Sequence, residues 1–250
     1  MTRYVKRFKI APHDFQEERP LDAPAAEPTT SLRDRVLRRV RSEIVSGHSI
    51  PGTMYSVPAL AASLGVSTTP VREALLELSR TGLITPMRNR GFRVEPTSLA
   101  DLNNIFALRD LLERYAMVAI AERRITDTGP LRALADEVAA AVRKKDVEGY
   151  VETDRAFHQA LVARAENPLL TRMIMDLRDE MRLYGIDSPA GRQRQITSVK
   201  EHYQLIELAE AGETEAIADL ISRHILDWQP IFTAALAEAT GRRRVQGLAR

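Results

Sequence analysis

One carboxylate and three imidazoles in the second half of the chain have the types and spacing of metal ligands: Asp154, His158, His202 and His224. Asp154 and His158 are spaced i and i+4 on the apolar stripe of segment 147–165, so both side chains point inward. His202 and His224 lie on the apolar stripes of two later segments. Because burial of a charge or an unpaired polar group costs several kcal/mol, a shared metal ion would satisfy all four residues at once. Imidazole with carboxylate suits zinc, nickel, manganese or iron(II).

The residues alone leave a second interpretation of this set open. Each histidine could be a separate core residue that is hydrogen-bonded to a backbone carbonyl and shares nothing with the other two. The apolar stripes by themselves do not choose between a shared metal ion and three independent histidines.

Arg109 and Ser198 are candidates for binding an anionic ligand beside these residues. Arg109 lies on the inner side of segment 98–125, and a buried guanidinium needs an anion, which it grips as a bidentate fork when the anion is a carboxylate. The alternative is a salt bridge to Asp110 or Glu113. Ser198 lies one helical turn before the histidine of its segment and could line the same pocket. Three other arginines are expected at the surface or in an interface: Arg155, Arg178 and Arg182.

A second candidate site lies in the first half of the chain, after the turn at 64–66 between two short helical segments. The candidate DNA-binding residues there and in the hairpin that follows are Ser67, Thr68, Thr69, Arg72, Arg88, Arg90 and Gly91. Arg72 could make a bidentate contact to guanine in the major groove, and the hydroxyls and the helix N-terminus suit phosphates. Arg88 and Arg90 could follow the DNA backbone or enter a minor groove. The alternative is a fold used for protein contacts, with these arginines solvated.

Hydrophobic periodicity predicts the elements that must position these two sets of residues. Helices at 32–46, 56–65 and 67–82, with two extended pieces at 83–85 and 92–94, make a winged helix-turn-helix with a small β-hairpin wing. Six further helices are expected at 98–125, 130–145, 147–165, 168–185, 192–211 and 213–238, and they form an all-helical bundle that binds a ligand. Ser98 and Asp101 form a capping-box pattern at the start of the first of these. The fold class is therefore mainly α.

The length of 250 residues is sufficient for two domains. We expect a flexible arm over 1–30, a DNA-binding domain over 31–95, an effector-binding and dimerisation domain over 96–240, and a basic tail over 241–250. Residues 31–95 contain ten arginines against five acidic residues, whereas residues 96–240 contain 17 basic and 24 acidic residues. A basic segment at 31–95 followed by an acidic segment at 96–240 indicates that the basic segment binds a polyanion.

The composition also excludes several classes of protein. The chain has no cysteine, which excludes disulfides and thiolate chemistry. No apolar run approaches the roughly 18 residues of a membrane span, and the basic N-terminus lacks the apolar stretch of a secretory signal. We therefore expect a cytoplasmic protein that has no membrane partner.

The first half of the chain resembles a known family. The run VSTTPVREAL at 66–75, followed by GLI at 82–84 and GF at 91–92, is similar to the DNA-binding head of GntR-family regulators. The resemblance covers residues 31–95 and implies a homodimer that reads a short palindromic operator in double-stranded DNA. Many members carry a base-contacting arginine where this chain has Thr68, so the operator sequence of a relative does not transfer.

The second half resembles the FadR-type C-terminal domain, or FCD domain, of the same family, in its metal-binding subset. The resemblance covers residues 98–232 and rests on Asp154-x-x-x-His158, Glu201-His202 and His224-Ile225, with LLE at 111–113 and AENP at 165–168. It implies that the aspartate and the three histidines bind a divalent metal, with zinc as the first expectation. It also implies that a small organic acid completes the coordination and that Arg109 contacts this effector. The acyl-CoA ligand of the namesake belongs to a branch without these histidines.

Together these observations predict a ligand-responsive transcription regulator, expected to be a repressor, that senses a carboxylate metabolite through a metal site. One alternative is a metal-dependent enzyme, but the neighbour of His202 that could act as a general base, Glu201, should point roughly 100° away on the helix. Another alternative is a DNA-binding dimer whose metal is purely structural.

Overall fold

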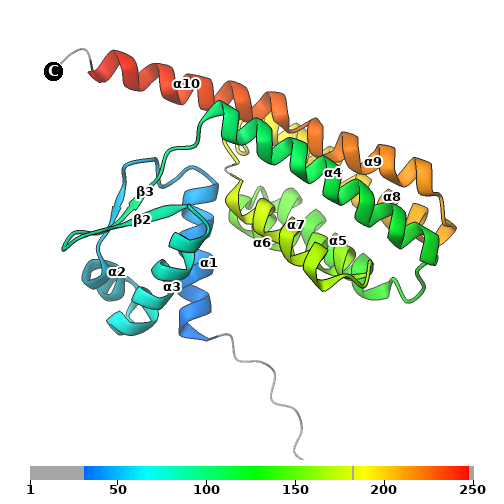
Figure 1. Cartoon of the computed structure of the whole chain (residues 1–250), viewed down its shortest axis with the longest axis horizontal. Coiled ribbons are helices and arrows are strands. Elements are labelled where there is room, and N and C mark those ends of the chain that lie inside the picture. Colours follow the sequence, from blue (N-terminus) through cyan, green and yellow to red (C-terminus); the bar gives the residue numbers. More distant parts are fainter. Residues whose placement is uncertain (1–30, 182, 248–250) are drawn as a thin grey trace, which may run out of the picture. The chain divides into compact units, whose positions relative to one another are not determined.

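The computed structural model describes residues 31–181 and 183–247, with side chains described through Glu238. Figure 1 shows a group of short helices with a small sheet, coloured blue to cyan, and a bundle of longer helices, coloured green to red. The predicted arm over 1–30, Arg182 and the last three residues of the basic tail lie outside the described residues. None of the described helices combines the length and the apolar character that crossing a bilayer requires.

The first group contains three helices and three strands. Their bounds are α1 (Leu32–Val45), β1 (Met54–Tyr55), α2 (Val57–Leu64), α3 (Thr68–Arg80), β2 (Ile84–Met87) and β3 (Gly91–Val94). Helix α2 ends where Gly65 adopts a left-handed φ of 64°, a conformation that glycine reaches without strain. The chain then turns into α3, which buries Val71, Ala74, Leu75 and Leu78. This is the predicted winged helix-turn-helix.

The three strands form an antiparallel sheet in the order β1-β3-β2. In the hairpin of β2 and β3, Ile84 lies opposite Val94 and Met87 lies opposite Gly91. The sequence predicted these two strands but not β1, because two residues are too few to show a periodic pattern. Only glycine suits the closing position of the hairpin: φ of Gly91 is 104°, and a Cβ there would lie 2.1 Å from the carbonyl oxygen of Tyr55.

The second group is the predicted all-helical bundle. Its helices are α4 (Leu99–Arg123), α5 (Gly129–Lys144), α6 (Val147–Ala163), α7 (Pro168–Glu180), α8 (Pro189–Ala211), α9 (Thr214–Leu226) and α10 (Gln229–Gly247). The prediction of one helix at 213–238 is wrong, because Pro230 lacks the N–H that would continue the hydrogen bonds of α9 into α10. Helix α7 ends earlier than predicted, and Met181 after it is extended. Helix α8 begins earlier than predicted, with Ser188 as its N-cap.

Each group has its own hydrophobic core. The core of the first group contains Val40 and Leu75, and the core of the bundle contains Phe106 and Phe157. The capping box of Ser98 and Asp101 begins α4, as predicted. The core of the bundle also encloses polar side chains from α4, α6, α8 and α9: Glu113, His158, Ser198, His202 and His224. These buried polar side chains mark the candidate site.

Candidate metal centre and DNA-binding surface

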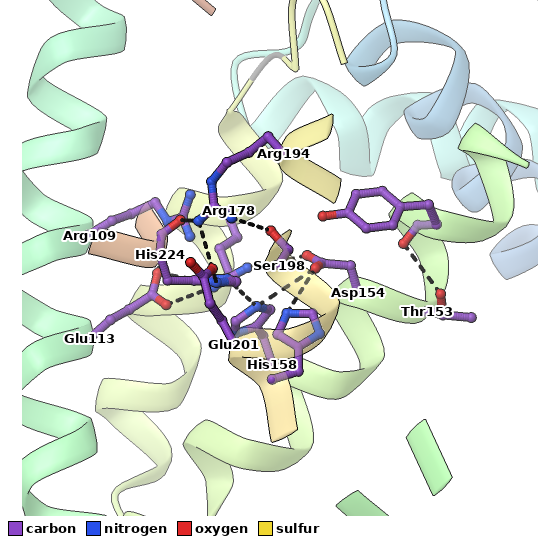
Figure 2. Close-up of polar contacts among 12 residues, drawn as sticks. Arg109, Glu113, Thr153, Asp154, His158, Arg178, Arg194, Ser198, Glu201 and His224 are labelled. Atoms are coloured by element: carbon purple, nitrogen blue, oxygen red, sulfur yellow. Dashed lines mark hydrogen bonds and ion pairs between the residues drawn. The ribbon is translucent and has the colours of Figure 1, made fainter. Parts of the chain in front are cut away.

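Three histidines converge inside the bundle. His158 comes from α6, His202 from α8 and His224 from α9, and none is more than 3% exposed. One ring nitrogen of each lies within 4.8 Å of the others, and the Nε2 atoms of His158 and His224 are 3.2 Å apart. Figure 2 shows these two rings close together beside Asp154. The sequence predicted that the three histidines face the core, and the structure adds that they face one another.

Asp154 lies at the edge of this cluster, one helical turn before His158. Its side chain is 20% exposed, and its Oδ1 is 3.4 Å from Nε2 of His202 and 3.8 Å from Nε2 of His158. Metal–nitrogen bonds of about 2.0–2.1 Å in a tetrahedral zinc site place neighbouring ligand atoms about 3.3 Å apart. The separations among these side chains are therefore compatible with a tetrahedral ion.

Among the described residues, the cluster also contains one buried nitrogen without a hydrogen-bond partner that a cation would satisfy, Nε2 of His202. Both nitrogens of His202 and Nδ1 of His158 lack a hydrogen-bond partner among the residues that the structure describes. Burial lowers the pKa of all three imidazoles well below the usual range, and the nearby guanidinium groups act in the same direction. The rings are therefore neutral at neutral pH, which is the state that binds a metal ion. The donor set fits a divalent ion such as zinc.

Two arginines and one glutamate form a buried ion cluster next to the histidines. Nε of Arg109 donates to Oε1 of Glu113 at 2.8 Å, and Nη2 of Arg178 donates to Oε2 at 2.7 Å. Burial alone would raise the pKa of Glu113, but the two guanidiniums outweigh it and lower the pKa to about 2. The salt bridge between Arg109 and Glu113, one of the alternatives left open by the sequence, is therefore present. Nη1 of Arg109 faces Sδ of Met181 at 3.3 Å, and a thioether is a weak acceptor.

The prediction that Arg178 lies at the surface or in an interface is wrong, because this residue pairs with the buried Glu113 inside the bundle. Its side chain is 9% exposed, and its Nη1 is 3.6 Å from Oδ2 of Asp154. The sequence did carry a signal, because Arg178 follows the buried Ile174 by one helical turn on the inner stripe of α7. Arg155 is partly exposed, as expected, and donates to both carboxylate oxygens of Asp179.

A cavity of about 80 Å³ opens beside the ion cluster. Its charged lining includes Arg109, Asp154 and Arg178, and its apolar lining includes Trp228 and Phe232. A guanidinium binds carboxylates well, and aromatic walls favour the carbon skeleton of a ligand. The lining is therefore suited to a small organic anion.

A further chain of polar contacts lies behind His224, and the sequence analysis did not find it. Oε2 of Glu201 is 2.7 Å from Nδ1 of His224 and accepts a hydrogen bond from Nη2 of Arg194 at 2.7 Å. Nη1 of Arg194 donates to Oγ of the fully buried Ser198 at 3.2 Å. Glu201 lies about 100° around α8 from His202. Its side chain therefore points toward α9, where it contacts His224. The proposed contact of Ser198 with an effector stays a prediction.

The predicted DNA-binding residues stand on the outside of the first group. Ser67, Thr68, Thr69, Arg72, Arg88 and Arg90 are exposed, and Gly91 is partly buried. The side chain of Ser67 makes no capping hydrogen bond to α3, so its hydroxyl and the first N–H groups of the helix can meet a phosphate. Arg88 and Arg90 flank Asn89, which turns the tip of the hairpin with a φ of 58°. Contacts of these residues with DNA stay predictions.

Comparison with known proteins gives matches over both groups. The profile of the bacterial regulatory proteins of the gntR family matches residues 32–94, and that of the FCD domain matches residues 104–227. The HTH-type transcriptional regulator McbR of Escherichia coli strain K12 is 30% identical over 207 residues, which cover 78% of this chain and 91% of that protein. The HTH-type transcriptional repressor RspR of the same strain is 26% identical over 203 residues, which cover 79% of this chain and 87% of that protein. The solved structure of E. coli McbR/YncC superposes with a TM-score of 0.68 at 25% identity and covers 84% of this chain and 99% of that chain.

Proposed function

This chain belongs to the gntR family of bacterial regulatory proteins and carries an FCD domain, and we propose that its DNA binding responds to a small organic acid held at a metal ion. As a member of this family it is a DNA-binding transcription regulator and not an enzyme. We propose that it acts as a repressor, which is how its relative RspR is named. The convergence of His158, His202 and His224 inside the bundle carries the proposal.

We infer that zinc is the ion and that Asp154, His158, His202 and His224 hold it. The separations between their ligand atoms support a tetrahedral site. His202 would gain most, because its buried Nε2 has no hydrogen-bond partner among the described residues. Nickel, manganese and iron(II) accept the same donor types and are the alternatives to test. By expanding to five-coordination, the bound ion would supply a positive anchor for one oxygen of the acid.

We propose that Arg109 holds the carboxylate of the effector. Its Nε is bound to Glu113, whereas its Nη1 faces a thioether, which a carboxylate would replace as a far stronger acceptor. Ser198 is the second proposed effector-binding residue; it is fully buried and accepts a hydrogen bond from Arg194. The cavity of about 80 Å³ is suited to a small acid.

We propose that residues 31–95 bind the operator and that residues 96–240 bind the effector and form the homodimer. Helix α3 would enter the major groove with Arg72 at the base edges. The other residues proposed to contact DNA are Ser67, Thr68, Thr69, Arg88, Arg90 and Gly91. A homodimer would place two such helices on the two halves of a palindrome, about one helical turn apart.

The covalent connection between the two groups suggests how the acid would act on DNA binding. Helix α4 carries Arg109 and begins at Leu99, shortly after β3 ends at Val94. A ligand that binds Arg109 more tightly in one position of α4 than in another would shift the population of DNA-competent dimers. We propose that the acid releases the operator by this route.

Measurements on the full chain test this proposal. Elemental analysis after gentle purification should find about one ion per protomer, and His202→Ala should lose most of it. Titration of the operator complex with a panel of small carboxylic acids should release the protein at concentrations that also raise its thermal stability. Metal that stays bound without any response to acids would indicate a purely structural ion. Metal-free protein with a full response would rule the metal out.

Substitution of Arg109 separates effector binding from metal binding. Arg109→Ala should keep its metal and its operator affinity but lose most of the response to the acid, because the carboxylate loses its guanidinium partner. Arg114→Ala is the matched control, since Arg114 lies on the exposed side of the same helix. If Arg109→Ala responds at the parental acid concentration, Arg109 serves only the salt bridge to Glu113.

A further inference from the structure

We propose that Glu201 fixes the orientation and raises the basicity of the metal-facing imidazole of His224, and that Arg194 holds Glu201 in place for this purpose. Figure 2 shows Arg194, Ser198, Glu201 and His224 in one connected group next to the ligands of the proposed site. The inference rests on the proposed metal and assigns two positioning residues to it.

The contact between Glu201 and His224 determines which ring nitrogen carries the proton. Oε2 of Glu201 is 2.7 Å from Nδ1 of His224, and both side chains are buried. Because a carboxylate only accepts hydrogen bonds, Nδ1 of the neutral ring must donate, and Nε2 keeps its lone pair. Nε2 is the atom that lies 3.2 Å from Nε2 of His158. Glu201 therefore presents an unprotonated nitrogen of His224 to the centre.

The other two histidines have no equivalent support. Nδ1 of His158 and Nδ1 of His202 have no hydrogen-bond partner within the part of the chain that the structure describes. His202 is held instead by stacking on Phe157, with ring centroids 4.2 Å apart. Among the three imidazoles, His224 is thus the one whose tautomer and ring plane are fixed by a carboxylate before an ion arrives.

Arg194 fixes Glu201 and the backbone of His224 at the same time. Its Nη2 donates to Oε2 of Glu201 at 2.7 Å and to the carbonyl oxygen of His224 at 2.9 Å. Its Nη1 donates to Oγ of Ser198, and its guanidinium lies 5.7 Å from the ring centroid of Trp228. Since this arginine is only 6% exposed, it also balances the buried charge of the carboxylate. The side chain and the main chain of one metal-facing residue are therefore held by a single group.

The spacing on α8 explains how these residues meet. Arg194, Ser198 and Glu201 stand at i, i+4 and i+7, which places them on one face of the helix. His202 follows at the next position and faces the centre from the adjacent side. Helix α8 thus supplies a metal-facing histidine on one stripe and the support for the histidine of α9 on the neighbouring stripe.

A carboxylate behind a metal-bound imidazole stabilises the positive charge that the ring acquires on coordination. Loss of such a partner lowers metal affinity by about 10–100-fold in other sites. The alternative is a purely structural role, in which Arg194 and Glu201 only connect α8 to α9. In that case substitution of Glu201 would lower the stability of the metal-free protein, and the tautomer of His224 would not depend on Glu201. The two roles differ in metal affinity and in the protonation of the ring.

The test uses the full chain with zinc ions as the probe. Glu201→Gln keeps the size and one acceptor oxygen but removes the charge, and Glu201→Ala removes both. Competition against a chromophoric chelator should show that Glu201→Ala binds zinc about 10–100-fold more weakly, with Glu201→Gln between it and the parental chain. Glu207→Gln, an exposed position on the same helix, should bind as the parental chain does.

A second readout does not depend on the ion. In the metal-free parental chain, imidazole ¹⁵N shifts should show His224 in the single tautomer with the proton on Nδ1, and Glu201→Ala should lose this preference. If Glu201→Ala does not fold, Glu201→Gln carries the same comparison. Parental zinc affinity in both Glu201 variants overturns this inference and leaves the proposed metal intact. A parental chain that binds no zinc overturns the metal itself, and the assignment of Glu201 with it.

Discussion

Helix α3 exposes to solvent the side chains proposed to contact DNA, whereas the bundle buries the side chains proposed to bind the metal ion. Thr68, Thr69 and Arg72 are exposed on a scaffold whose hydrophobic core is complete without them. His158 and His202 are at 0% exposure inside the core of the bundle. An exposed polar group is solvated until a partner arrives, but a buried polar group needs a partner inside the protein or a bound ion.

This difference separates binding from stability in one region and couples them in the other. The exposed residues of α3 can change without loss of packing, so their substitution should alter affinity for DNA alone. The buried residues around the histidines neutralise one another's charges and satisfy one another's hydrogen bonds. Their substitution should therefore alter stability as well as ligand binding.

The largest effect is expected at Glu113, which is fully buried between two guanidiniums. Glu113→Gln should lower the free energy of unfolding by about 3–5 kcal/mol, because it leaves Arg109 and Arg178 buried without their shared charge partner. Glu166→Gln is the control, since Glu166 pairs with Arg123 in solvent with 71% and 45% side-chain exposure. This control substitution should lower the free energy of unfolding by about 0–1 kcal/mol. Urea unfolding measures both.

The contribution of Glu113 should also depend on pH. Its pKa lies at about 2 in the folded chain, below the ordinary value of 4.5. Such a group contributes its full stability above 4.5 and loses it as the pH falls through the folded pKa. The difference between the parental chain and Glu113→Gln should therefore shrink between pH 4.5 and pH 2. A constant difference across this range would contradict the ion pairing that the structure assigns to Glu113.

A smaller effect, confined to DNA binding, is expected at Arg72. Arg72→Ala should weaken binding to the specific operator by about 1–3 kcal/mol, because a bidentate contact to a base is lost. Its urea unfolding should match that of the parental chain. Arg80→Ala, at the exposed C-terminal end of the same helix, should keep the parental affinity. Parental operator affinity in Arg72→Ala would exclude a role in reading bases.

The same contrast explains what the sequence could predict. The winged helix-turn-helix was predictable because its signals are local. The turn at Gly65, the apolar stripe of α3 and the hairpin at Gly91 lie close together in the chain. Strand β1 was missed because two residues carry no period. The break between α9 and α10 had a signal in Pro230, but the apolar pattern that continues past it suggested a single helix.

In the bundle, periodicity predicted which residues face inward but not which of them meet. The stripes placed His202 and His224 in the core correctly. They did not show that Glu201 reaches His224, because that contact depends on how α8 and α9 are rotated against each other. Arg178 had the spacing of an inner residue, yet its charge favoured the surface when its partner Glu113 was unknown. The pattern of each helix by itself therefore did not predict which side chains of different helices contact each other.

The smallest effect is expected at the wing, where a contact with DNA would be electrostatic and independent of sequence. Arg88 and Arg90 are exposed at the tip of the hairpin, with the turn made by Asn89 between them. Each phosphate contact that they make releases counterions, so each lost contact should reduce the slope of log affinity against log salt by about 0.9. The double variant Arg88→Ala with Arg90→Ala should therefore lower the slope by up to about 1.8 and weaken specific and non-specific DNA equally. Arg93→Ala is the control, since Arg93 is engaged by Glu95. A parental slope in the double variant would mean that the wing does not touch the DNA backbone, and a change limited to the specific operator would assign the wing to base reading.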